Sequence, residues 1–124
     1  MKATILLTLA ISVAGCSSAE RQREDALMNR IEASARLPTG ALPLRAYARH
    51  YREFEDSTVG VLYEVPAHLP NGDWSLGVAP NERRWYGRDE DVPMVLDGGC
   101  SVLTARYNPT DNAFIAPMTC HARA

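Results

Sequence analysis

Six side chains in this sequence are of types that bind metals, form disulfides or transfer protons. They are three cysteines and three histidines: Cys16, Cys100, Cys120, His50, His68 and His121. A structural zinc site takes four ligands at recognisable spacings, and the chain has no Cys-x-x-Cys pair, so we expect neither a metal nor another cofactor. Cys120 and His121 are adjacent, and because neighbours on a strand point to opposite faces, they are a poor nucleophile and base pair.

The histidines also lack the surroundings of the common catalytic classes. The sequence contains no GxSxG, HExxH or SxxK motif and no phosphate-binding glycine loop. A general acid and base can still be brought together from distant residues by folding. We therefore lean against an enzyme and assign no catalytic residue. The alternative is a small periplasmic hydrolase or peptidoglycan-active enzyme that uses His50 or His121 with a carboxylate, although His50 and His68 are expected at the surface or in turns.

The N-terminus has the layout of an export signal. Met1-Lys2 is a short positive region, an uncharged and mostly apolar stretch runs from Ala3 to Val13, and small residues follow. The apolar stretch is shorter than the roughly 20 residues that a transmembrane helix needs. We expect a secretory signal rather than a membrane span.

The end of this signal carries a more specific motif, Val13-Ala14-Gly15-Cys16. It resembles the lipobox of bacterial lipoproteins, in which an aliphatic residue and two small residues precede a cysteine. The resemblance implies that Cys16 is acylated and that residues 1–15 are removed. The alternative is a plain signal peptide cut near Ala14 or Ala19, with Cys16 incidental.

Lipidation of Cys16 would determine how the remaining chain is organised and where it is located. Removal of 15 of the 124 residues leaves 109, with a polar tether at 16–23 and a single small domain at 24–124. Two or three acyl chains would anchor this domain to a membrane without a further helix. We expect an exported protein, lipid-anchored on the periplasmic side of the cell envelope. Ser17, where some lipoproteins have Asp, resembles the outer-membrane sorting pattern.

The two remaining cysteines are expected to form a disulfide, because an exported protein meets oxidising conditions. Cys100 to Tyr107 and Ala113 to Cys120 read as two strands around the turn signal at 108–112. A turn centred on Thr110 would pair Cys100 directly with Cys120. The loop between them has about 20 residues, and closing it should stabilise the domain by roughly 3 kcal/mol.

The remaining elements are read from hydrophobic spacing and turn residues. A helix is expected to about Arg36, with Leu27 and Ile31 on one face, before Pro38 and Gly40 stop it. Residues 44–54 fit helix and strand equally, and we favour a strand because the β-run at 58–65 can pair back on it across the turn at 55–57. Two short strands are expected at 74–78 and 83–86, and an edge strand at 93–96. These elements predict an α+β fold: one N-terminal helix packed on an antiparallel sheet of about five strands, ending in a disulfide-linked β-hairpin.

Arginine and aromatic residues in two of these segments are candidate binding residues: Tyr47, Arg49, Tyr51, Trp85 and Tyr86. Their types are enriched at interfaces and suit a glycan or a protein of the envelope. Core aromatics with solvated arginines between them are the alternative, and the more ordinary one. The formal net charge of −2 excludes the basic surface that nucleic-acid binding requires.

The strand entry Gly98-Gly99-Cys100 and the terminal Cys120-His121 resemble, in style, short uncharacterised exported proteins of proteobacteria. This resemblance implies no activity. The sequence therefore predicts a membrane-anchored envelope lipoprotein that serves as a structural or binding module.

Overall fold

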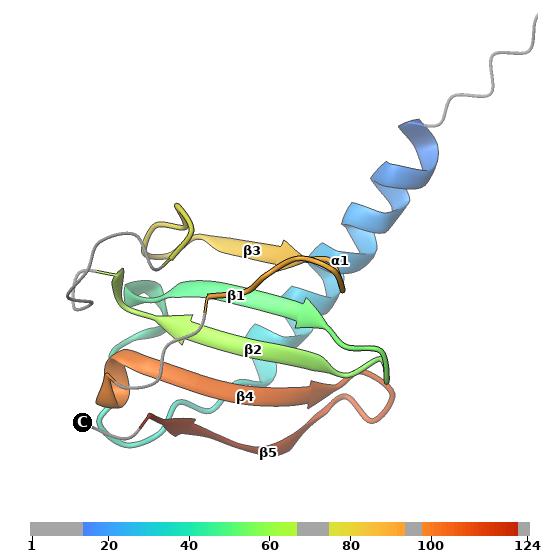
Figure 1. Ribbon diagram of the computed structural model, residues 1–124. Helices are drawn as coiled ribbons and strands as arrows, with labels where there is room; N and C mark the ends of the chain where they lie inside the picture. The colour runs from blue at the N-terminus through green and yellow to red at the C-terminus, as the bar shows by residue number, and fades with distance from the viewer. Residues whose placement is uncertain (1–13, 67–74, 94–97, 122–124) are drawn as a thin grey trace, which may run out of the picture.

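One helix lies against one face of a five-stranded sheet in the computed structural model, which describes residues 14–66, 75–93 and 98–121 (Figure 1). The elements in chain order are α1 (Ala14–Ser34), η1 (Leu44–Ala46), β1 (Ala48–Glu53), β2 (Val59–Glu64), β3 (Arg83–Tyr86), η3 (Gly99–Ser101), β4 (Val102–Asn108) and β5 (Ala113–Cys120). Here η denotes a short 3₁₀ helix. The expected α+β class with a single N-terminal helix is confirmed.

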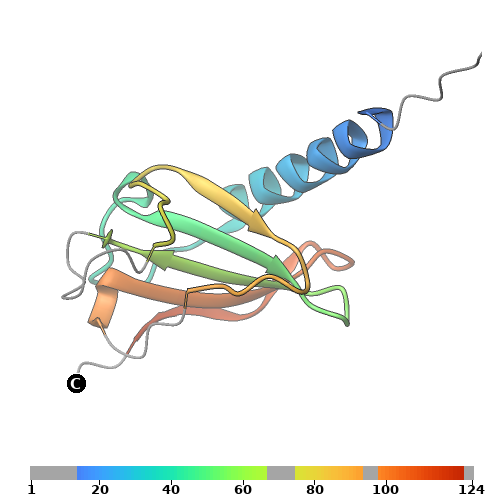
Figure 2. The same ribbon diagram turned by 45° about the horizontal axis from the view of Figure 1, so that its top comes forward.

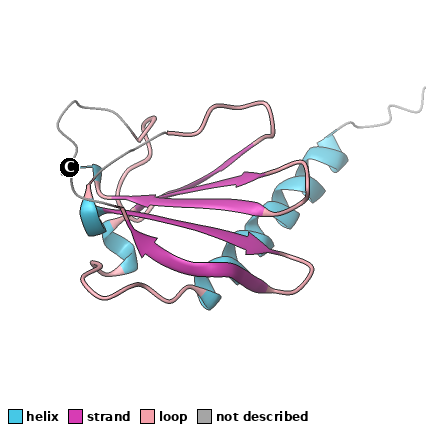
Figure 3. Ribbon diagram, turned by 60° about the horizontal axis from the view of Figure 1, so that its bottom comes forward, coloured by secondary structure: helices cyan, strands magenta, loops and turns pink. Residues whose placement is uncertain are grey.

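The helix packs on the sheet through its C-terminal half. Leu27, Met28 and Ile31 are buried, as their spacing predicts, whereas residues 17–23 are exposed. Those exposed residues were expected to form a tether but are helical, so the first turns of α1 project beyond the sheet (Figures 2 and 3). Within the described residues, no helix has the length and apolar character needed to cross a bilayer.

The strands are ordered β3-β1-β2-β4-β5. The prediction that β1 pairs back on β2 is confirmed, with Tyr51 opposite Val61 in an antiparallel register. The turn between these strands is fixed by Asp56, whose Oδ1 accepts hydrogen bonds from the backbone N–H and the hydroxyl of Thr58 at 3.1 and 2.6 Å. A short polar side chain that bonds the backbone two residues on is the usual chemistry of such turns.

The prediction of a fully antiparallel sheet is wrong at one edge, where β3 runs parallel to β1. Glu64, at the end of β2, is paired with Ala48, and Arg83, at the start of β3, is paired with Arg49. The connection 65–82 thus begins and ends beside the start of β1, at the same end of the strands, and β3 runs antiparallel to β2 on the other side of β1. The strand expected at 74–78 is absent, because residues 75–77 form a turn and Trp74 lies outside the described residues. Residues 91–93 are not in a strand, and 94–97 lie outside the described residues.

Cys100 and Cys120 form the expected disulfide, with a Cα–Cα distance of 4.4 Å. The register expected around it is wrong, because Cys120 lies opposite Leu103 rather than Cys100. Cys100 belongs to the 3₁₀ turn η3, and irregularities between Thr104 and Tyr107 shift the pairing of β4 with β5. A bulge places an extra residue in one strand, so partners no longer sum to a constant. The turn that precedes Cys100 has positive φ angles at Gly98 (126°) and Gly99 (56°), which glycine adopts without strain.

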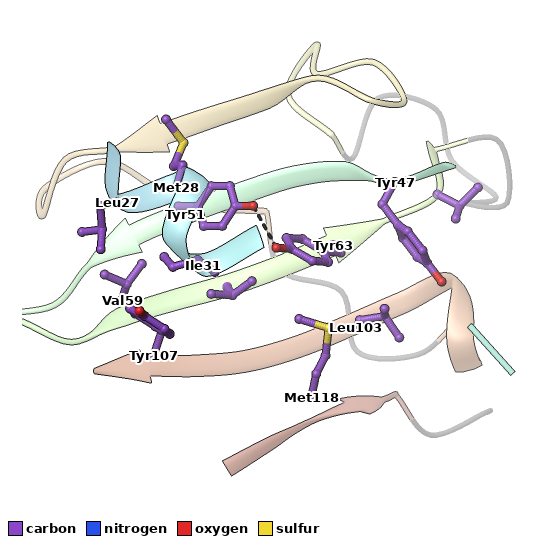
Figure 4. Packing of buried hydrophobic residues seen from close by; sticks show 12 residues of the cluster. Leu27, Met28, Ile31, Tyr47, Tyr51, Val59, Tyr63, Leu103, Tyr107 and Met118 are labelled. Carbon is purple, nitrogen blue, oxygen red and sulfur yellow. Dashed lines mark hydrogen bonds between the residues drawn. The ribbon is translucent and has the colours of Figure 1, made fainter. Parts of the chain in front are cut away.

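The core between α1 and the sheet is rich in tyrosine. All five tyrosines of the chain are fully buried, and four of them belong to this core, where Tyr51, Tyr63 and Tyr107 pack near Ile31 of the helix (Figure 4). The hydroxyl groups of Tyr51 and Tyr63 are 2.8 Å apart. A buried hydroxyl needs a hydrogen-bond partner, and Tyr51 finds a second one on the helix, because its hydroxyl donates to Oε1 of Glu32 at 2.8 Å.

Candidate functional site

Most of the predicted binding residues are not on the surface. Arg49 and Tyr51 of β1, and Tyr47 just before this strand, point toward the helix; Tyr47 and Tyr51 are fully buried and Arg49 is 8% exposed. Trp85 packs partly buried against the same core, and Tyr86 is fully buried on the opposite face of the sheet. The alternative of core aromatics therefore holds for the tyrosines, but Arg49 is buried rather than solvated.

The buried arginine is held by a carboxylate from the helix. Nε of Arg49 lies 3.1 Å from Oε1 of Glu32, and Nη1 of Arg83 lies 3.1 Å from Oε2 of the same side chain. The hydroxyl of Tyr51 donates to Oε1 of Glu32 at 2.8 Å. This Glu32 cluster (Glu32, Arg49, Tyr51 and Arg83) joins α1 to β1 and β3, so its role is structural.

The sheet face that points away from α1, which we call the far face, includes His50, Arg52, Leu62, Glu64, Thr104 and Arg106. A second polar cluster, the His50 cluster (His50, Glu64 and Tyr86), lies on this face. Nε2 of His50 lies 3.1 Å from Oε1 of Glu64, and Nδ1 lies 2.7 Å from the hydroxyl of Tyr86. Glu64 and Tyr86 are each diagonal neighbours of His50 in the strand pairing, which is within reach of long side chains. The register of three strands thus assembles the cluster.

An imidazole beside a carboxylate is the arrangement that general acid–base catalysis uses, but a substrate has to reach it. His50, Glu64 and Tyr86 are each 0% exposed. The prediction that His50 lies at the surface or in a turn is wrong, since it lies within β1 at the centre of this cluster. The cluster therefore acts as a buried hydrogen-bonded unit in this conformation.

The other histidines do not join this cluster. His121 is half-buried, and its Nε2 lies 3.2 Å from the hydroxyl of Thr104. His68 lies outside the described residues. Among the residues that the structure describes, no group of three His, Cys, Asp or Glu side chains is arranged to hold a metal ion.

The far face also carries an open pocket of about 310 Å³, at the lower end of the range for small-ligand sites. At one end, Arg52 and Arg106 flank Gly60 as direct cross-strand neighbours. The ring of Phe54 occupies the space above this glycine, where a Cβ atom would lie 2.6 Å from Cε2 of the ring. The residues that line the pocket are Arg52, Phe54, Gly60, Val61, Leu62, Val92, Pro93, Thr104, Ala105 and Arg106.

Both guanidinium groups lie near the ring of Phe54. The Arg106 guanidinium carbon is 4.3 Å from the ring centroid and that of Arg52 is 5.7 Å away, both within cation–π distance. Asp56 lies beside Arg106, with Oδ2 3.3 Å from Nη2. Hydrogen bonds from the hydroxyl and backbone of Thr58, with help from Arg106, hold the pKa of Asp56 below its usual value. The arginine–phenylalanine pocket (the cavity lined by Arg52, Phe54 and Arg106) is therefore a partly aromatic, positively charged site with an apolar floor.

The acidic segment after β3 is engaged locally. Glu90 accepts a hydrogen bond from the backbone N–H of Gly87 at 3.0 Å and lies 3.1 Å from the guanidinium of Arg84. These two contacts lower the pKa of the Glu90 carboxyl, the backbone bond being the larger cause. Its role is to shape the loop that leads to Val92 and Pro93.

Comparison with known proteins adds nothing to this geometry: no protein-family model, no curated protein and no solved structure matches the chain. The arginine–phenylalanine pocket and the His50 cluster were both missed from sequence. A usable signal for the pocket is Gly60, which interrupts the run of large apolar residues from Val59 to Tyr63. A glycine inside a strand often marks the close approach of another group.

Proposed function

We propose that this chain is an exported bacterial lipoprotein, anchored through Cys16 on the periplasmic side of the cell envelope, whose domain is a binding or accessory module. Three observations support this. The sequence Val13-Ala14-Gly15-Cys16 matches the lipobox pattern, Ser17 favours the outer membrane, and a disulfide at Cys100–Cys120 suits an oxidising compartment.

The helix suits such an anchor. Cys16 lies near the start of α1, and from residue 17 onward the first buried side chain of the helix is Leu27. At a rise of 1.5 Å per residue, the intervening segment would hold the domain about 16 Å from the acylated end. This distance would leave the sheet accessible to soluble or membrane-bound partners.

The observation that carries a binding role, rather than catalysis, is the contrast between two sites on the far face. The His50–Glu64 pair is fully buried, whereas the arginine–phenylalanine pocket is open and lined by types that recognise ligands. The pocket has the size of a small-ligand site, whereas an envelope protein or a glycan would contact the outer surface of the domain. We propose that this pocket is where the module binds.

Intact mass spectrometry of the protein from the membrane fraction of its own host tests the anchor. We expect a chain that begins at residue 16 and carries acyl groups, and a Cys16→Ala variant that is not acylated and leaves the membrane fraction. A Cys100→Ser/Cys120→Ser variant is the matched control, because it also loses cysteines but keeps the motif. An unacylated native chain would refute the anchor.

Native mass spectrometry of the same preparation tests the pocket. We expect a non-covalent small molecule to copurify with the native chain and to be missing from a Val92→Trp variant, in which the larger side chain fills the pocket. Leu42→Trp, at an exposed position away from the pocket, is the control. A molecule retained by Val92→Trp, or no molecule at all, would count against this binding site.

A further inference from the structure

The two arginines of the pocket differ in how far the protein itself neutralises them. Arg106 donates from Nε to the hydroxyl of Thr58 at 2.8 Å, and its Nη2 forms the ion pair with Asp56. Arg52 donates from Nη2 to the backbone carbonyl of Arg88 at 2.6 Å. No carboxylate in the described part of the chain lies within ion-pair distance of Arg52, so the rim keeps about one positive charge without an anionic partner.

The rest of the pocket is mainly apolar. Leu62 and Gly60 form part of its floor, and Val92 and Pro93 come from the loop after β3. A ligand that fills such a site gains from the burial of apolar surface, and a polar group fixes its orientation. The pocket therefore combines a hydrophobic compartment with one cationic end.

We propose that the arginine–phenylalanine pocket takes a small monoanion, an apolar group that ends in a carboxylate, with the carboxylate at Arg52 and the apolar part against Leu62, Val92 and Pro93. This proposal rests on the binding role proposed above and names its ligand class. A planar guanidinium matches a carboxylate through two parallel hydrogen bonds, which makes arginine the suitable cation.

The balance of charge favours a monoanion over a dianion such as a phosphate monoester. Asp56 is ionised at neutral pH, since Thr58 and Arg106 lower its pKa, and it already offsets the charge of Arg106. A second negative charge on the ligand would have no cation of its own, and Asp56 lies beside Arg106, one of the residues that line the pocket. Electrostatic repulsion acts over several ångströms, so the Asp56 carboxylate would disfavour a second negative charge on the ligand.

Isothermal titration calorimetry of the full chain in lipid nanodiscs tests the ligand class with three probes of equal chain length: octanoate, octanamide and octyl phosphate. Empty nanodiscs give the background for partition into lipid. We expect octanoate to bind about tenfold or more tightly than the neutral octanamide, as a charge-assisted hydrogen bond implies, and more tightly than octyl phosphate. Equal binding of octanoate and octanamide would overturn the proposal, and so would tighter binding of octyl phosphate.

Two arginine variants then locate the charge. Arg52→Gln should weaken octanoate binding by about tenfold or more and leave octanamide unchanged. Arg45→Gln removes the same charge at an exposed site outside the pocket and should change octanoate binding by less than about twofold. If both variants bind octanoate like the native chain, Arg52 does not read the carboxylate and the proposal fails.

The two proposals fail in different ways. If no octyl probe binds but a molecule still copurifies with the native chain and is lost in Val92→Trp, the pocket is a binding site and the ligand class is wrong. If no probe binds and no molecule copurifies, the binding role itself is wrong.

Discussion

Nε2 of His50 and Oε1 of Glu64 are 3.1 Å apart, and neither side chain has any exposed surface. Oε2 of Glu64 has no hydrogen-bond partner, so the carboxylate depends on this one contact. A buried ionisable group that loses its partner costs about 3–5 kcal/mol, whereas replacing the whole pair with apolar residues can cost little. A single substitution at His50 or Glu64 should therefore destabilise the fold far more than replacing both residues together.

We expect His50→Phe to lower the free energy of unfolding by about 3–5 kcal/mol, because Glu64 is left buried without a partner. The double variant His50→Phe/Glu64→Leu should be more stable than His50→Phe alone. Urea unfolding followed by circular dichroism measures both changes. A double variant whose loss of stability equals the sum of the two single losses would show that the residues are not coupled.

The Glu32 cluster makes a similar prediction for the docking of the helix. Glu32→Gln removes the charge that faces Arg49 and Arg83, and Arg49 is then a buried cation without its ion-pair partner. We expect the free energy of unfolding to fall by about 2–4 kcal/mol. Glu20→Gln, at an exposed position on the same helix, is the matched control and should change stability by less than about 0.5 kcal/mol. If Glu32→Gln and Glu20→Gln are equally stable, the Glu32 cluster does not stabilise the docking of the helix.

Local patterns predicted much of this fold. The i, i+4 spacing of Leu27 and Ile31 identified the helix and its buried face, and the turn at 55–57 identified the β1–β2 hairpin. The cysteine pair was found because an even number remained in a chain expected to be exported. In each case the information lies within a few residues of the element it specifies.

The register around the disulfide was wrong for a local reason, the irregular pairing within the β4–β5 hairpin, but three other features were missed because they depend on contacts between distant segments. No sequence signal in residues 65–82 shows which strand β3 pairs with, so its parallel placement beside β1 was missed. His50 was assigned to the surface because its partners, Glu64 and Tyr86, come from two other strands. The pocket depends in the same way on Arg52 and Arg106, which meet only across Gly60.

The disulfide should contribute substantially to a domain of this size. Cys100 and Cys120 are 20 residues apart, and closing a loop of that length stabilises a folded chain by roughly 3 kcal/mol in the chain-entropy model. We expect Cys100→Ser/Cys120→Ser to lose about that amount in urea unfolding. A reducing agent should have a comparable effect on the native chain and none on the variant. If reduction leaves the native chain unchanged, the bond does not stabilise the fold.

The buried tyrosines predict a loss of stability at alkaline pH. Burial raises the pKa values of Tyr51 and Tyr63 far above the ordinary value of about 10, and burial also raises those of Tyr47 and Tyr86. Above pH 10 the unfolded chain therefore releases protons that the folded chain keeps. Since the unfolded state then binds fewer protons, the free energy of unfolding falls as the pH rises.

Each strongly shifted tyrosine removes about 1.4 kcal/mol of stability per pH unit above 10, and below that pH its contribution is constant. Tyr51 and Tyr63 together should thus cost about 3 kcal/mol at pH 11. Absorbance at 295 nm should show no tyrosinate from Tyr51 and Tyr63 until the domain unfolds, and then a cooperative rise that coincides with the loss of the circular dichroism signal. The double variant Tyr51→Phe/Tyr63→Phe, measured against its own stability at pH 8, should lose less stability between pH 10 and 11 than the native chain does. Titration of Tyr51 and Tyr63 near pH 10 in a folded domain would contradict this prediction.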